Sequence, residues 1–119
     1  MTITELTKTY DFHDSLITGI EQDDLLNQLV ISIEFSFWAQ EGFKEGMPET
    51  GMISLVFHEV EDFDCAGLEG EIDFFSIMDT IVDNNKLFLN LLDDFHDKVY
   101  ELFITSPNVD FLVLGGESV

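Results

Sequence analysis

Arginine is absent from this chain, and lysine is scarce. Four lysines stand against 25 aspartates and glutamates among the 119 residues, so the formal net charge is −21 at pH 7. A general nucleic-acid binder needs lysine and arginine to displace the counterions of the phosphates. Docking on an anionic membrane needs the same basic residues. The charge therefore excludes the first class and argues against the second, and we expect neither nucleic acid nor membrane as a partner.

Cysteine and long apolar segments are also scarce. Cys65 is the only cysteine, so the chain cannot form an internal disulfide. Residues 1–10 lack the apolar run of a signal peptide. The longest strongly apolar stretch, 25–38, is interrupted by five polar residues and is too short and polar to cross a bilayer. These absences favour a reduced, cytoplasmic location.

Hydrophobic residues make up 45% of the chain, which predicts a folded protein despite the charge. A length of 119 residues is that of one ordinary domain. No internal repeat and no linker is visible in the sequence. We therefore expect a single acidic domain over residues 1–119.

Alternation of apolar and polar residues predicts the strands. The pattern is clearest over residues 29–38, where a period of two indicates a half-buried strand. A weaker strand at 15–21 followed by the turn residues 22–24 completes a β-hairpin. Further strands are expected over residues 52–60, 86–92, 98–105 and 109–114.

The remaining segments are rich in glycine, proline and charge. Residues 40–51 indicate an exposed loop, and residues 63–71 a series of turns. Residues 72–82 fit either one short helix or short strands, and we favour strands. In sum, the sequence predicts a mostly β fold, a single-domain antiparallel β-sandwich or roll of about six to seven strands.

Motifs for catalysis are weak. His13, Asp14 and Ser15 are the residue types of a hydrolase triad, but neighbours in sequence usually point in different directions. A turn at the start of the first strand explains Asp14 and Ser15 equally well. No Gly-x-Ser-x-Gly elbow, phosphate-binding glycine loop or dinucleotide fingerprint occurs. We expect no catalytic residue and no cofactor.

Metal-binding signals are no stronger. His96 lies in an acidic turn at residues 93–97, without the spacing of a zinc pair or of a calcium loop. A solvated hairpin tip accounts for it, and a position on a strand accounts for His58. The neighbouring carboxylates of Asp62 and Asp64 raise the pKa of the Cys65 thiol and disfavour a nucleophilic role.

The unpaired acidity is the feature that calls for a reason. Self-repulsion among the carboxylates costs stability, and nothing in a fold requires it. It serves either solubility or attraction to a basic partner. For a partner surface, the sequence offers the acidic residues Glu59, Glu61, Asp62 and Asp64. Trp38 and Phe43 can act as aromatic anchors there, or can cap one end of the fold.

The opening of the chain is similar to a group of known proteins. Residues 12–15 (Phe-His-Asp-Ser), followed by Ile17, Ile20 and a long alternating strand, resemble the start of small uncharacterised bacterial His-Asp-Ser proteins. Some of these are grouped with immunity proteins of polymorphic toxin systems, and a looser similarity covers residues 84–104. The resemblance implies an all-β fold and, for some members, binding that neutralises a toxin. It transfers no catalytic residue.

Three hypotheses follow. The first is a non-enzymatic acidic binding protein, an immunity-like inhibitor of a basic toxin or nuclease. The second is a metal-binding or hydrolytic domain that uses His13 or His96 with nearby aspartates. The third is a structural or assembly subunit. The sequence leaves the partner's identity and the oligomeric state open.

Overall fold

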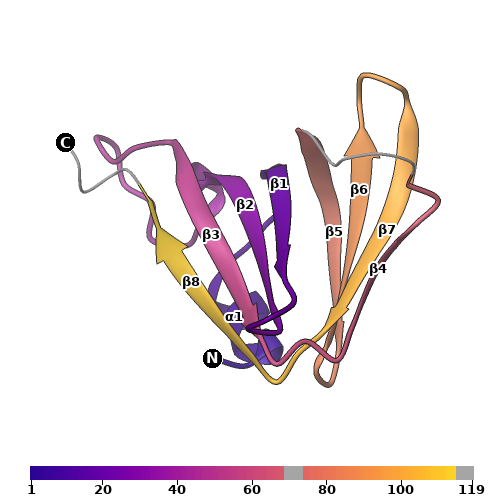
Figure 1. The fold of residues 1–119 in the computed structure, drawn as a ribbon. Coiled ribbons are helices and arrows are strands. Elements are labelled where there is room, and N and C mark those ends of the chain that lie inside the picture. The colour runs from indigo at the N-terminus through magenta and orange to yellow at the C-terminus, as the bar shows by residue number, and fades with distance from the viewer. Residues whose placement is uncertain (69–73, 115–119) are drawn as a thin grey trace.

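The computed structural model describes residues 1–68 and 74–114, and these confirm the mostly β class (Figure 1). Eight strands form one antiparallel sheet in the order β4-β7-β6-β5-β1-β2-β3-β8, slightly more strands than the sequence predicts. In chain order they are β1 (Leu16–Asp23), β2 (Gln28–Ser36), β3 (Thr50–His58), β4 (Asp62–Ala66), β5 (Phe75–Asp83), β6 (Lys86–Asp93), β7 (Lys98–Thr105) and β8 (Asn108–Val113).

Two short helical elements accompany the sheet. The helix α1 (Ile3–Thr9) begins with a capping box, in which Thr2 and Glu5 each accept a main-chain N–H of the other. The buried side chains of Ile3 and Leu6 anchor this helix on the core. A single 3₁₀ turn, η1 (Phe37–Ala39), ends the long strand predicted over 29–38. No helix in the described part of the chain is long and apolar enough to cross a membrane.

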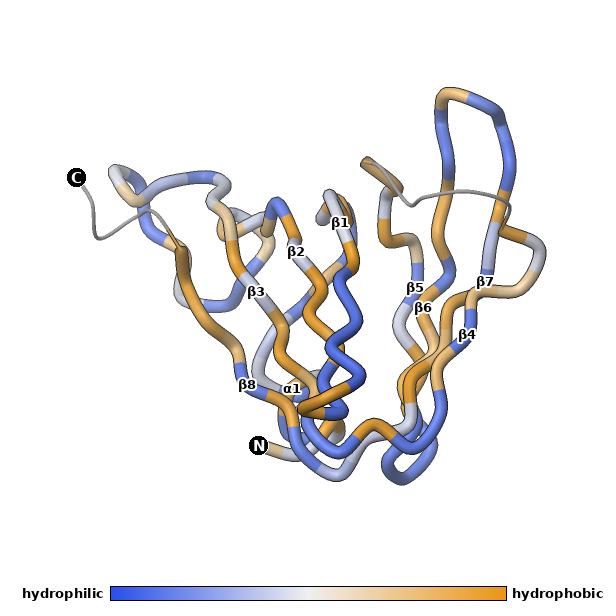
Figure 2. Tube along the Cα trace, viewed as in Figure 1, coloured by the Kyte–Doolittle hydropathy of each residue, from blue (hydrophilic) through white to orange (hydrophobic). Residues whose placement is uncertain are grey.

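The strands form where the sequence alternates. In β2 and β6 every second side chain is buried, and Figure 2 shows hydrophobic residues concentrated in the strands. The turn between β5 and β6 has Asn84 in the left-handed region, with φ 54°, which asparagine tolerates better than most residues.

One ambiguous segment follows the favoured prediction, and another differs from its prediction. Residues 75–83 form the strand β5, which excludes the alternative of a short helix over this part of 72–82. Residues 72–73 lie outside the described residues. Strand pairing with β6 overrides the helical spacing of apolar residues there. The turns predicted over 63–71 are wrong for residues 63–66, which belong to β4 because residues 62–66 pair with β7 over their whole length. Residues 69–71 of that prediction lie outside the described residues.

The sheet consists of two four-stranded halves with the same arrangement (Figure 1). β1, β2 and β3 are successive neighbours in one half, as β5, β6 and β7 are in the other. The fourth strand of each series crosses to the opposite half, so β4 pairs with β7 and β8 with β3. Each half also has a register shift at the same place, between Ile17 and Gly19 in β1 and between Ile77 and Asp79 in β5. The halves are thus related by a topological repeat with exchanged fourth strands.

The two crossing links make equivalent contacts. In the link from β3 to β4, the N–H of Val60 donates to the carbonyl of Asn27 in the β1–β2 turn at 3.2 Å. In the link from β7 to β8, the N–H of Ser106 donates to the carbonyl of Asn85 in the β5–β6 turn at 3.0 Å. These bonds hold both links against the hairpins and fix the register of the exchanged strands.

One face of the sheet, with α1, encloses the hydrophobic core. A cluster of aromatic rings lies within it, and Tyr10 stacks on Phe111 of β8 with 3.8 Å between ring centroids. Phe35 of β2 contacts both rings edge to face. The opposite face of the sheet, called the outer face below, carries the polar residues and a smaller set of apolar ones.

Candidate binding surface

The outer face of β5, β6, β7 and β4 carries an apolar row that the strand register assembles. Phe88 in β6 lies opposite Ile81 in β5 and Phe103 in β7. Both neighbours of Phe88 along β6 are buried leucines, so alternation turns the phenylalanine to the outer face. Ile81 is 54% exposed, and the two phenylalanines are half-buried. The row is apolar surface that the fold leaves partly accessible on its outer face.

Lys86 covers part of this row. Its Nζ lies 4.3 Å from the ring centroid of Phe103 and 5.2 Å from that of Phe88, within the range of a cation–π interaction. The two rings are 6.3 Å apart and tilted by 49°. The pair therefore forms a platform that already accommodates one ammonium group.

Carboxylates surround the aromatic platform. Asp64 lies directly opposite Phe103, and the rows on either side place further acidic residues on β4, β5 and β7. We call the set the acidic face; its members are Asp62, Asp64, Asp79, Asp83 and Glu101 around Ile81, Lys86, Phe88 and Phe103. All five carboxylates are exposed, with Lys86 as the single cation among them.

The acidic residues predicted from the sequence all lie at or beside this face. Asp62 and Asp64 belong to it, on alternate positions of β4. Glu59 and Glu61 lie in the crossing link just before β4, where both are exposed. The N–H of Glu61 donates to the carbonyl of Thr105 at 2.8 Å, which holds this link beside β7.

The predicted aromatic anchors lie elsewhere. Trp38 is in η1 and Phe43 follows in the β2–β3 loop, in the half of the sheet that does not contain β4 (Figure 1). The side chain of Trp38 is 49% exposed, and the main-chain N–H of Trp38 donates to the carbonyl of Glu49, which closes the loop. The structure therefore separates these two residues from the acidic run and gives the acidic face different aromatic residues, Phe88 and Phe103.

Lysines do not neutralise the carboxylates. Over residues 1–68 and 74–114, every side-chain ion pair within 4.0 Å joins a histidine to an aspartate, and none joins a lysine to a carboxylate. The negative charge of the acidic face is thus available to a partner.

The His13-Asp14-Ser15 motif organises the start of β1. Ser15 is fully buried, and its Oγ accepts the N–H of Ser36 at 3.0 Å. The hydroxyl of Ser36 donates to the carbonyl of Asp14 in return, at 3.3 Å. His13 Nδ1 lies 3.3 Å from Asp14 Oδ2, and both side chains are well exposed. The three side chains serve different contacts and form no triad.

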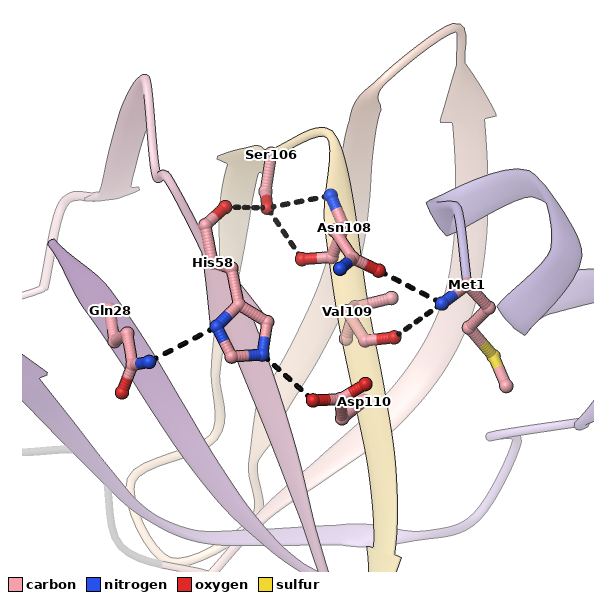
Figure 3. Close-up of polar contacts among 7 residues, drawn as sticks. All are labelled: Met1, Gln28, His58, Ser106, Asn108, Val109 and Asp110. Carbon is pink, nitrogen blue, oxygen red and sulfur yellow. Dashed lines mark hydrogen bonds and ion pairs between the residues drawn. The ribbon is translucent and has the colours of Figure 1, made fainter. Parts of the chain in front are cut away.

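His58 lies in a polar row on the outer face of the other half (Figure 3). Its Nδ1 is 3.1 Å from Nε2 of Gln28, and its Nε2 is 2.8 Å from Oδ2 of Asp110. The Gln28 amide nitrogen can only donate, so it pairs with Nδ1 as an acceptor in the tautomer whose Nε2 donates to Asp110. Ser106 contacts the main-chain carbonyl of His58 and not its ring, so this group also lacks the geometry of a hydrolase triad.

His96 and Asp93 stabilise the β6–β7 turn. Asp93 is 6% exposed and accepts three hydrogen bonds, from the main-chain N–H groups of Phe95 and His96 and from Nδ1 of His96 at 2.7 Å. Burial alone would raise the pKa of Asp93, but these bonds outweigh it and hold the pKa below its usual value. The hairpin tip expected from the sequence is thus built around this aspartate.

The histidines do not converge on a metal site. His13 lies before β1 and His96 in the β6–β7 turn, each with one aspartate partner. No group of three or more histidine, cysteine, aspartate or glutamate side chains that could hold a metal occurs in the described ranges. Cys65 is half-buried on β4, where burial and then Asp64 raise the pKa of its thiol, in the direction expected from the sequence.

Sequence analysis did not predict the aromatic part of the acidic face, although the sequence contains a signal for it. Phe88 interrupts the alternation of 86–92, since it is apolar at a position where a half-buried strand carries a polar residue. Phe103 does the same in 98–105. Two large apolar residues at outward positions of neighbouring strands indicate an exposed patch.

In comparisons with known proteins, no family model, no curated protein and no solved structure matches the chain.

Proposed function

We propose that this chain is a non-enzymatic acidic binding protein whose acidic face receives a basic surface of another protein. The observation that carries the proposal is the platform of Phe88 and Phe103 inside a ring of five carboxylates. Solubility alone would account for dispersed charge, but not for two large, half-buried apolar rings on the outer face at its centre.

Charge and apolar area have separate roles in this arrangement. Unpaired carboxylates attract a basic protein over a distance of about 10 Å at ordinary ionic strength and speed the encounter. Apolar rings that become desolvated on contact provide most of the affinity. Asp62 and Asp64 supply the first property, and Phe88, Phe103 and Ile81 supply the second.

In its general form, the proposal takes the partner to be a basic protein. In its narrower form, the partner is a basic toxin or nuclease. A nuclease active site is built to hold phosphates and is rich in lysine and arginine. An acidic surface of this kind can occupy such a site as a phosphate backbone does. The resemblance of residues 12–15 to His-Asp-Ser proteins, some grouped with immunity proteins, supports the same form.

The test compares two variants with the same charge change. In the face variant, Asp62→Lys is combined with Asp64→Lys; in the control, Asp23→Lys at the end of β1 is combined with Asp24→Lys in the β1–β2 turn. Each protein is immobilised, exposed to purified basic nucleases and to a low-salt lysate, and eluted with a salt step. We expect a basic protein to be retained by the wild type and the control but not by the face variant.

Truncation of the platform gives the second arm. Phe88→Ala with Phe103→Ala keeps every charge, and we expect it to weaken binding of the same partner by about tenfold or more, as desolvated aromatic anchors do. If the face variant and the turn control lose binding equally, the acidity acts as a general charge and the proposal is wrong. Binding that is insensitive to salt would also contradict it.

A further inference from the structure

A cleft of about 710 Å³ lies beside β5, on the side turned toward β1. One wall is formed by Met78, Asp79, Thr80 and Val82 of β5. The facing wall is formed by the end of α1 and the segment leading to His13, and residues 39–41 close one side. The cleft shares only Asp79 with the acidic face, so it is a separate place on the molecule.

β5 has a free edge along this cleft. Its pairing with β1 covers Phe75 and Ser76, and it ends where the N–H of Asp14 donates to the carbonyl of Ile77 at 3.0 Å. Beyond Ile77, no strand in the described part of the chain pairs with this edge. Six residues of β5, 78–83, remain without a partner on this edge, a length of about 20 Å at roughly 3.3 Å per residue.

The β5–β6 turn determines which main-chain groups point into the cleft. Two residues separate Asp83 from Lys86, and in such a hairpin the flanking residues hydrogen-bond to each other. Asp83 therefore directs its main-chain groups toward β6. Alternation along the strand turns those of Val82 and Thr80 the other way, and both residues line the cleft. Their N–H and C=O groups are the template to which an added strand bonds.

The walls are joined by hydrogen bonds and carry a net negative charge. The side chain of Gln40 accepts the N–H of Asp11 at 2.8 Å and donates to the carbonyl of Ser36 at 3.0 Å, which fixes the wall opposite β5. The charged lining consists of Asp11, Glu41 and Asp79 against Lys8, with His13 as a further titratable group. Three carboxylates and one ammonium leave a net charge of −2 with the imidazole neutral.

We propose that this cleft binds an extended, lysine-containing peptide segment, which adds a strand to the free edge of β5 between Met78 and Val82. The proposal rests on the proposed function, since it takes the segment to be part of the basic partner. Main-chain bonds to Thr80 and Val82 hold the peptide, and the carboxylates of Glu41 and Asp11 select its positive side chains. The cleft thus receives a flexible segment, while the acidic face receives a folded surface.

The test uses the whole protein and three synthetic peptides. The first is acetyl-Lys-Val-Lys-Val-Lys-amide; the others carry N-methyl groups either on both valines or on all three lysines. An added strand uses the N–H groups of only one edge of the peptide, so we expect one methylated peptide to bind like the parent and the other to lose binding. Amide NMR shifts of Thr80 and Val82 report binding at the cleft, and those of Phe88 and Phe103 report binding at the acidic face.

A charge-reversal variant tests whether the carboxylates that line the cleft contribute to peptide binding. We expect Glu41→Lys to weaken binding of the parent peptide by about fivefold, the upper range of an exposed ion pair, and Glu45→Lys in the same loop to leave it unchanged. Equal behaviour of the two methylated peptides, equal effects of the two lysine variants, or shifts confined to the acidic face would overturn the cleft proposal. Peptide shifts at the acidic face alone would contradict the cleft proposal but would be consistent with the proposed function. The proposed function fails if the variant with both Asp62 and Asp64 replaced binds the basic protein like the control.

Discussion

The hydroxyl of Ser106 lies 2.6 Å from the main-chain carbonyl of His58, where the two crossing links meet (Figure 3). Ser106 is fully buried, and its Oγ also accepts the N–H of Asn108 at 3.3 Å. One side chain thus ties the end of β3 to the start of β8. The N-terminal amine adds a further tie, to Oδ1 of Asn108 at 2.9 Å. The exchange of strands between the halves depends on this junction.

Ser106→Ala should destabilise the fold. It removes the hydrogen bond to the carbonyl of His58 at a partly buried position, which costs about 0.5–1.5 kcal/mol in the free energy of unfolding. Chemical denaturation measures the change. Ser54→Ala, at a buried serine of β3 whose side chain makes no such bond, is the matched control and should have little effect. Equal stability of the two variants would show that the junction bond contributes nothing.

Lys86→Gln should strengthen binding of a basic partner at the acidic face. The substitution removes the ammonium from the rings of Phe88 and Phe103 and frees the platform for the partner's own cation. We expect an affinity gain of about threefold to fivefold, close to the value of one exposed cation–π contact. Lys44→Gln changes the net charge by the same amount in the β2–β3 loop and should have no comparable effect. Titration calorimetry with the retained nuclease measures both.

Added salt should raise the melting temperature. At a net charge of −21, repulsion among carboxylates opposes the compact state, and salt screens it. Calorimetry from about 10 mM to 500 mM sodium chloride covers Debye lengths from roughly 30 Å to 4 Å. A melting temperature that stays constant over this range would mean that the carboxylates lie too far apart to repel one another appreciably.

Asp93 should contribute stability that disappears in acid. The pKa of this carboxyl is held below its ordinary value of 3.8, so the folded state favours the ionised form. The contribution is complete above about pH 5 and is lost as the pH falls through the lowered pKa. Asp93→Asn should therefore lower the melting temperature near pH 6, with the difference from wild type narrowing toward pH 3. Asp94→Asn, in the same turn but exposed, should show no such convergence.

Cys65 should react slowly with alkylating reagents. Burial on β4 and the neighbouring charge of Asp64 raise the pKa of the thiol, so less thiolate is present at pH 8 than in a free peptide. The rate with iodoacetamide should fall below that of glutathione and should rise in Asp64→Asn. A thiol that reacts as fast as glutathione would mean that β4 is not held against β7.

Local patterns account for the elements that sequence analysis predicted. The strands at 29–38, 86–92 and 98–105 have a period of two because one side of each is buried. α1 was missed because seven residues are too few to show a helical period, although the capping box of Thr2 and Glu5 was present. β4 was missed because its alternate aspartates indicate a turn until β7 is known to lie beside it.

The sequence by itself determined the sign and excess of the charge, the mostly β class and the position of most strands, because these follow from composition and from neighbours along the chain. Only the tertiary structure decided that the fourth strands exchange between two like halves. That exchange sets the carboxylates of Asp62 and Asp64 beside the ring of Phe103, about forty positions away in sequence. Strand register is fixed by contacts between distant segments, so no local pattern predicts which side chains it brings together.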